Sequence, residues 1–140
     1  MSSTVRATLE RYTPTEHGTK PLPATLELVQ EEIKKIENDW STTIELASDE
    51  TQVLITASRG GYAVFASVGE DQFFDLVGDP SSRGNAEFVQ GGQPAEHPRR
   101  HIVPKSLALK AAAAFFKQPT DPLRLGGLQW EKQEDWQRLE

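Results

Sequence analysis

The sequence contains no cysteine among its 140 residues. This excludes disulfide bonds, thiol nucleophiles and cysteine-ligated zinc sites, and it is typical of proteins in a reducing compartment. The sequence also lacks an apolar run of about 18 residues, which a membrane-spanning helix would need. The first residues, Met1–Arg6, do not combine a charged start with an apolar block, so no signal peptide is visible. We therefore expect a cytoplasmic protein without a membrane segment.

Basic residues are scarce in the middle of the chain. Between residues 41 and 80, Arg59 is the only basic residue and stands against seven acidic ones, and the whole chain has a net charge of −6. Because nucleic acid binding needs the opposite sign of charge, we expect no nucleic-acid partner. An acidic stretch is either a solvated face or a docking face for a basic protein, whose approach the charge would accelerate.

The length suits a single domain over residues 1–140 with one hydrophobic core. Short segments rich in Thr, Ile, Val and aromatic residues recur at even spacing, which predicts an antiparallel meander. Residues 14–23 contain Gly18, Pro21 and Pro23 as breakers, so this stretch is predicted to be a loop. The predicted strands are residues 5–12, 42–47, 52–57, 62–68, 72–77 and 86–89, with a last short strand at 128–130.

Two stretches have helical patterns. Apolar residues spaced by three and four from Leu26 to Trp40 predict an amphipathic helix over residues 24 to about 39. A second, largely buried helix is predicted to begin at Pro104 and to end before Pro119. The expected fold is therefore α+β, with a curved antiparallel sheet of about five to seven strands packed against two α-helices. Residues 133–140 are polar and are expected to fray.

Motifs that could carry chemistry are few. His97 and His101 have the spacing of a helical metal pair, but Pro98 stands between them and two adjacent arginines would repel a cation, so we expect no metal. Gly91-Gly92-Gln93 spells the tripeptide of peptide release factors, but we interpret it as a turn that needs glycine dihedral angles, with Gln93 as an exposed contact. We expect no cofactor and no enzymatic activity. The enzymatic alternative is a small hydrolase or ligand-binding domain that uses His97, His101 and Asp79.

Two adjacent aromatic residues, Phe73 and Phe74, lie in a predicted strand. Successive side chains of a strand point to opposite faces, so one ring belongs to the core. The other ring is either covered by a helix or exposed. An exposed ring would be an anchor for a partner, since interface energy concentrates in aromatic residues.

The stretch from residue 73 to residue 131 has a distinctive order of motifs. An aromatic strand ends in Val77-Gly78-Asp79-Pro80, and a strand Glu87-Phe88-Val89 and the pair Gly91-Gly92 follow. Then come Glu96-x-Pro98, a Val103-Pro104 helix start, Phe115-Phe116, and a closing Leu128-x-Trp130-Glu131. This order resembles the first-numbered immunity protein family of bacterial polymorphic toxin systems. The basic residues Arg99, Arg100 and His101 depart from the apolar or aromatic residues expected at that point of the family pattern.

The resemblance implies a small cytoplasmic antidote, without catalytic residues or a cofactor, that binds a secreted toxin domain stoichiometrically. In this family the toxin is frequently a nucleic-acid deaminase, whose basic surface would suit an acidic antidote. The alternative of a general protein-interaction module stays open, and an exposed sheet edge would allow a homodimer. We expect the toxin to contact exposed polar residues, namely Asp49, Glu50, Glu70, Asp71, Asp75, Asp79, Gln90, Gln93 and Glu96.

Overall fold

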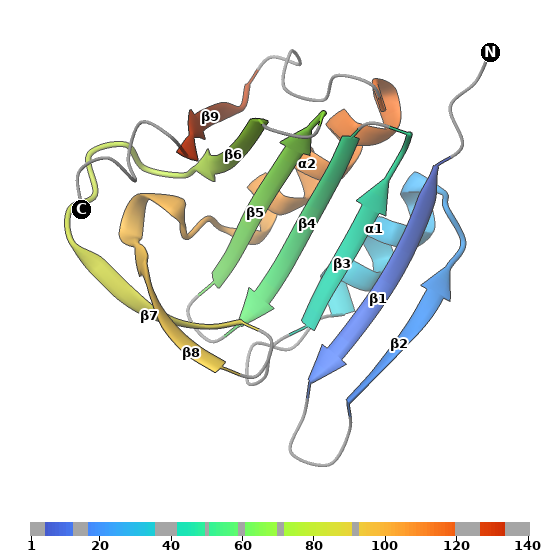
Figure 1. Ribbon diagram of the computed structural model, residues 1–140, viewed down its shortest axis with the longest axis horizontal. Helices are drawn as coiled ribbons and strands as arrows, with labels where there is room; N and C mark the ends of the chain where they lie inside the picture. Colours follow the sequence, from blue (N-terminus) through green and yellow to red (C-terminus); the bar gives the residue numbers. More distant parts are fainter. Residues whose placement is uncertain are drawn as a thin grey trace.

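The computed structural model describes residues 5–12, 17–35, 42–49, 51–58, 61–69, 72–90, 93–119 and 127–133. Within these ranges the chain forms a seven-stranded antiparallel sheet, a separate two-stranded hairpin and two α-helices, which confirms the predicted α+β fold. The strands of the large sheet are β1 (Arg6–Tyr12), β2 (His17–Leu22), β3 (Thr42–Ala47), β4 (Thr51–Ser58), β5 (Gly61–Val68), β6 (Gln72–Val77) and β9 (Gln129–Lys132). Their order is β2-β1-β3-β4-β5-β6-β9, with β2 and β9 at the two edges (Figure 1).

The strands β3 to β6 form the predicted meander, because each pairs with the next along the chain. The prediction of a loop over residues 14–23 was wrong for residues 17–22, which form β2. In this strand Pro21 lies directly opposite Thr8 of β1. Proline is tolerated there because β2 is an edge strand, where a missing backbone N–H breaks no ladder hydrogen bond.

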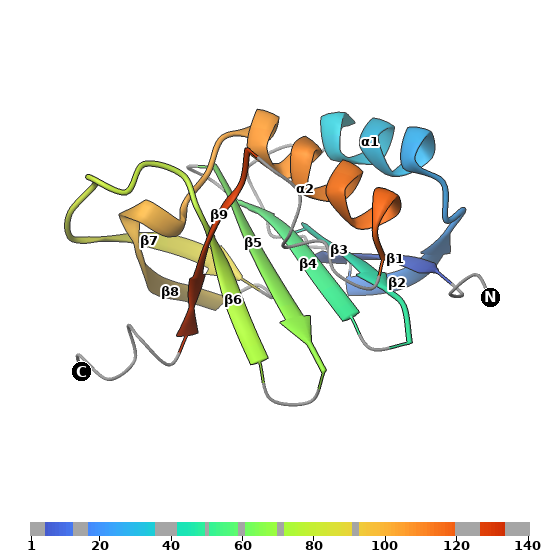
Figure 2. The same ribbon diagram turned by 90° about the horizontal axis from the view of Figure 1, so that it is seen from above.

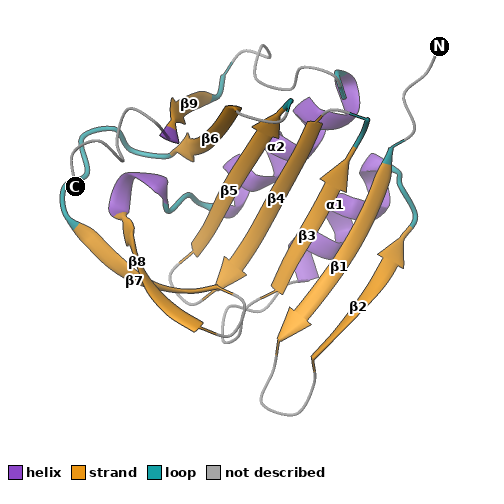
Figure 3. Ribbon diagram, viewed as in Figure 1, coloured by secondary structure: helices purple, strands orange, loops and turns teal. Residues whose placement is uncertain are grey.

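Both α-helices, α1 (Leu26–Lys35) and α2 (Lys105–Lys117), cover the same face of the sheet (Figures 2 and 3). Pro104 caps the start of α2, and the helix ends before Pro119 as predicted. The predicted extension of the first helix falls on residues 36–40, which lie outside the described residues. Neither described helix has the length and apolar character needed to cross a membrane.

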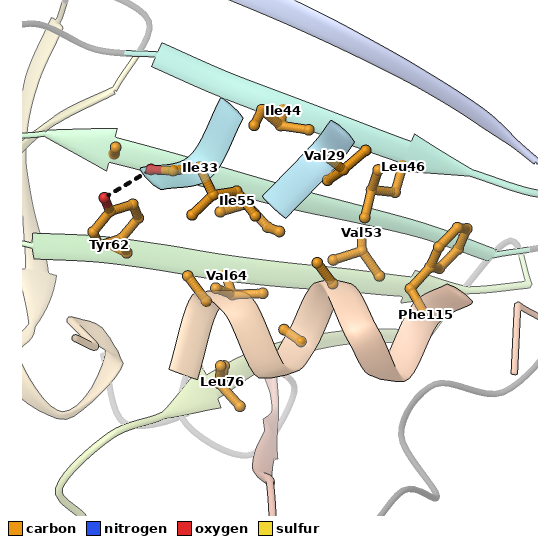
Figure 4. Packing of buried hydrophobic residues seen from close by; sticks show 14 of the residues in the cluster. Val29, Ile33, Ile44, Leu46, Val53, Ile55, Tyr62, Val64, Leu76 and Phe115 are labelled. Atoms are coloured by element: carbon orange, nitrogen blue, oxygen red, sulfur yellow. Dashed lines mark hydrogen bonds between the residues drawn. The ribbon is translucent and has the colours of Figure 1, made fainter. Parts of the chain in front are cut away.

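The hydrophobic core lies between this face of the sheet and the two helices (Figure 4). Val29 and Ile33 of α1 and Phe115 of α2 are fully buried in it, and four buried alanines of α2 allow the helix to approach the sheet closely. The hydroxyl of Tyr62 donates a hydrogen bond to the carbonyl of Ile33 at 3.3 Å, which ties β5 to α1. Burial raises the pKa of this tyrosine.

The strands β7 (Asn85–Gln90) and β8 (Gln93–Pro98) pair only with each other. The prediction that residues 86–89 extend the meander was therefore wrong. The position next to β6 is occupied by β9 instead, with Trp130 opposite Leu76. The hairpin lies beside the end of β4, and β7 contacts that strand (Figure 1).

A short 3₁₀-helix, η1 (Arg99–His101), leads from the hairpin toward α2. After it, Val103 and Tyr62 exchange two backbone hydrogen bonds, of 3.0 and 2.7 Å. Two glycines make room for this segment: a Cβ at Gly61 would lie 2.9 Å from Ile102 Cγ2, and one at Gly78 would lie 3.2 Å from the carbonyl oxygen of Ile102. Such short distances exclude larger residues unless the segment shifts. These glycines therefore serve the fold.

Candidate functional site

We call the face of the sheet opposite α1 and α2 the open face. A single cross-strand row runs over six strands of this face, and each of its members lies directly opposite the next. These residues alternate along their strands with core residues, so their side chains point away from the helices. All six are partly exposed. The row consists of Thr8, Glu45, Leu54, Phe65, Asp75 and Glu131.

An aromatic pair on β5 and β6 lies on the open face. The Phe73 and Phe65 rings stack with their centroids 5.9 Å apart and an interplanar angle of 21°. Phe73 is 38% exposed, whereas Phe74 packs against the core. The two adjacent rings therefore lie on opposite faces of β6, as the alternation predicts, and Phe73 is not covered by either α-helix. An exposed aromatic ring supported by a second ring is the usual chemistry of an interface anchor.

A shallow groove of about 640 Å³ lies beside this pair, at the end of the sheet where β3 ends and β4 begins. Polar residues line most of it, including the charged side chains of Arg6, Glu45 and Asp49. Ser67 lines the groove and lies directly opposite Phe73 in the β5–β6 ladder. The groove and the aromatic pair are therefore neighbouring parts of one surface.

A cluster of charged groups lies at the β6–β9 edge of the open face. The Arg100 guanidinium donates two hydrogen bonds to the Glu131 carboxylate, of 2.9 and 2.6 Å. The buried imidazole of His101 lies between two carboxylates, with Nε2 3.3 Å from Glu131 and Nδ1 4.0 Å from Asp75. Gln133 donates a further hydrogen bond to Asp75 at 3.3 Å. These contacts fasten η1 to β6 and β9.

The cluster perturbs the titration of its members. Burial lowers the pKa of His101, although the charges of Asp75 and Glu131 act in the opposite direction. Burial also lowers the pKa of His97, and Asp75 again opposes the shift. The hydrogen bond from Arg100 holds the pKa of Glu131 below its usual value. Near neutral pH the cluster therefore contains ionised Glu131 and Arg100 beside a neutral His101.

The predicted contact residues fall into different parts of the molecule. Asp49 and Asp79 are exposed but follow opposite ends of the sheet, since one comes after β3 and the other after β6. Asp75 is not a freely exposed acid, because it belongs to the charged cluster. Glu96 is exposed and lies opposite the exposed Glu87, an arrangement of like charges that weakens the hairpin.

Of the remaining predicted contacts, two lie in the β7–β8 hairpin and three fall outside the described residues. Gln90 and Gln93 pair with each other where β7 ends and β8 begins. Glu50, Glu70 and Asp71 lie outside the described residues.

The two histidines of the enzymatic alternative both interact with Asp75, whereas Asp79 has different partners. The His97 ring packs against Phe88 in an edge-to-face contact, with centroids 5.3 Å apart. His101 faces Asp75 and Glu131, while Asp79 accepts hydrogen bonds from the backbone N–H and hydroxyl of Ser81 at 2.9 and 2.6 Å. These bonds lower the pKa of Asp79. Among the described residues, no group of three or more His, Cys, Asp and Glu side chains could hold a metal ion.

Apart from Asp75, the members of the cross-strand row were not among the predicted contacts. Leu54 and Phe65 belong to predicted strands, and Glu45 is one of the seven acidic residues between residues 41 and 80. That these three residues lie side by side depends on the register of β3, β4 and β5. The Phe73-Phe74 pair was the one available signal. Strand alternation indicated that one of these rings could be exposed, but it gave no indication of the partner ring at Phe65.

No protein-family model matches this chain, and no curated protein matches it. The resemblance described above therefore rests on the motifs between residues 73 and 131.

Proposed function

We propose that this protein is an immunity protein that binds a cognate bacterial toxin domain and blocks it, as the resemblance implies. The observation that carries the proposal is the exposed Phe73, stacked on Phe65 on a sheet face that neither α-helix covers. Aromatic anchors of this kind concentrate binding energy in protein interfaces. In this proposal the protein is cytoplasmic, uses no cofactor and catalyses no reaction.

The charge of the chain supports the same proposal. The net charge of −6 would attract a toxin whose surface is basic because its substrate is a nucleic acid. Asp49, Asp79 and Glu96 are exposed and available for such attraction. We propose a deaminase-type toxin on this ground and on the resemblance.

The motifs between residues 73 and 131, which carry the resemblance, can be explained by the needs of the fold. This explanation is compatible with the proposal. β6 and β9, the first and last strands of this stretch, are neighbours in the sheet, and the glycine at position 78 admits the segment that leads to α2. Phe115 is buried in the core. Such residues maintain the scaffold, so the residues that select a toxin would be exposed positions beside them.

Co-expression tests the proposal. The toxin domain encoded beside this gene would be expressed in a bacterial host with and without this protein. We expect the pair to grow, and a complex with one copy of each chain to be recovered by affinity purification. Continued killing of the host, with no complex recovered from soluble and folded protein, would refute the proposal.

A further inference from the structure

The open face has an arrangement of charge that identifies the chemistry of its partner. We infer that the region around Phe73, Phe65 and Glu45 is a docking surface for a basic segment of the partner protein, which inserts an arginine beside Phe73. This inference rests on the proposed function, since it takes the toxin domain as the partner. It adds the surface that is used and the residue type that fills it.

The two faces of the molecule differ in charge. The helices α1 and α2 carry five lysines against three glutamates, so the helical layer is basic. On the open face, Glu10 and Glu45 are partly exposed carboxylates in β1 and β3, and Asp49 adds a third at the groove. Arg6 is the one cation that lines the described groove. A basic partner is therefore attracted to the open face and repelled by the helical layer.

Not every carboxylate of this face is available to a partner. Asp75 and Glu131 are occupied by contacts with His101 and Arg100. No ion pair among the described residues involves Glu45, which lies directly opposite Leu54 of β4 and two strands from Phe65 of β5. Glu45 is thus a carboxylate next to the apolar Leu54 that forms no ion pair with any described residue.

An arginine fits this arrangement better than a lysine does. Its planar guanidinium can stack on an aromatic ring such as Phe73. Glu45 lies three strands away on β3, about 14 Å at the usual strand spacing, so a second arginine of the same segment would donate the paired hydrogen bonds to this carboxylate. The groove that runs from Ser67, opposite Phe73, to Glu45 provides space for the part of the segment that lies between these two residues. A lysine would supply the charge but neither the planar stacking nor the paired hydrogen bonds.

A second copy of this chain is a poorer occupant of the same surface. A symmetric dimer through the open face would bring Glu10, Glu45 and Asp49 of one copy toward the same acidic face of the other. Like charges brought together in an interface are unfavourable. The basic segment of a different protein meets no such repulsion.

Four variants test the inference with matched controls. Phe73→Ser removes the anchor, and Leu28→Ser removes the similarly exposed apolar side chain of α1, which is 41% exposed against 38% for Phe73. Glu45→Lys reverses a charge on the open face, and Glu27→Lys reverses one on α1. We expect each open-face variant to weaken the toxin complex by about tenfold or more. Both α1 variants should bind as the wild type does, and circular dichroism and thermal melts would show that all four are folded.

A peptide-binding experiment without the toxin tests the docking surface separately from the proposed function. The ¹⁵N-labelled protein would be titrated with the capped peptide Ser-Arg-Leu-Arg-Ser and with its lysine and glutamate analogues. We expect NMR shift changes at Leu54, Phe65, Ser67 and Phe73, strongest with the arginine peptide.

Peptide binding at these positions without any toxin complex would refute the proposed function but support the docking surface. A toxin complex that the open-face variants leave unchanged would support the function and overturn the inference. So would a wild-type dimer that Phe73→Ser converts to a monomer.

Discussion

At the scale of single residues, several positions have surroundings that leave little freedom for substitution. The glycine at 61 is the clearest case. Its φ of +139° lies in the region that favours glycine, and a Cβ there would also meet Ile102 and Val103 at 2.9 and 3.1 Å. Both effects oppose any larger residue.

Gly61→Ala should therefore destabilise the protein by about 1–3 kcal/mol. Gly18→Ala in β2 is the matched control, because its φ is not positive and no atom lies within 4 Å of the place that an alanine Cβ would take. It should be neutral or stabilise by up to about 1 kcal/mol, since alanine restricts the unfolded chain. Urea denaturation of both variants measures the difference, and equal stabilities would contradict the role assigned to Gly61.

His101 makes stability depend on pH in a defined direction. In the unfolded chain a histidine titrates near pH 6.5, whereas burial lowers the pKa of His101 in the folded protein. The unfolded state therefore binds more protons below pH 6.5, and the stability present above that pH is lost as the pH falls toward the folded pKa. Glu131 adds a further loss in the acid range, below pH 4.5, because its pKa is also lowered.

We expect the free energy of unfolding to fall between pH 7 and pH 5, and His101→Gln to reduce that slope. Lys110→Gln, an exposed substitution on α2, should keep the slope of the wild type. Urea melts at each pH measure the free energy of unfolding of the wild type and of both variants. A slope that His101→Gln leaves unchanged, or a protein that becomes more stable on acidification over this range, would contradict the environment described for His101.

At the scale of secondary-structure elements, the helices and most strands follow from local patterns. The stripe of Leu26, Val29 and Ile33 predicts α1, and Pro104 and Pro119 bracket α2. β2 was missed because Pro21 argues against a strand unless that strand is known to lie at an edge. The partner of β6 was mistaken because β9 is more than 50 residues away in sequence, and local patterns do not encode such pairing.

The close packing of α2 predicts that a larger side chain in the core lowers the stability of the protein. Ala112 is fully buried where α2 packs, while the adjacent Ala113 is only partly buried. Ala112→Leu should destabilise the protein by about 1–3 kcal/mol, because a close-packed interior must shift to admit the larger side chain. Ala113→Leu should destabilise it less. Thermal and urea melts compare the two, and a larger loss for Ala113→Leu would contradict the helix orientation described.

At the scale of the whole molecule, the surface could be predicted only in part. The acidic middle of the chain and the exposed ring in β6 follow from composition and strand alternation. The sequence could not reveal that Phe65 stacks on Phe73, or that Asp75 is engaged by His101, because both depend on contacts between elements distant along the chain. The candidate site therefore differs from the predicted acidic and glutamine contacts, because it is centred on the aromatic pair of β5 and β6.

Asp49 and Asp79 are exposed acids at opposite ends of the sheet. Substituting each of them distinguishes docking on the groove from general electrostatic attraction. Asp49 lines the groove, whereas Asp79 follows the far end of β6. Asp49→Lys should slow association with the toxin and reduce its salt dependence, while Asp79→Lys should have a smaller effect. Stopped-flow association at low and high salt measures both rates. Equal effects would indicate that only the total charge matters.

The most direct measurement is a titration of toxin activity with this protein. The purified toxin domain encoded beside the gene would be held at a concentration well above the expected dissociation constant, and its activity followed as the protein is added. The proposed function predicts a linear fall that reaches zero at one equivalent of wild-type protein, with Phe73→Ser giving a shallower curve. Toxin activity that persists in excess wild-type protein would contradict it.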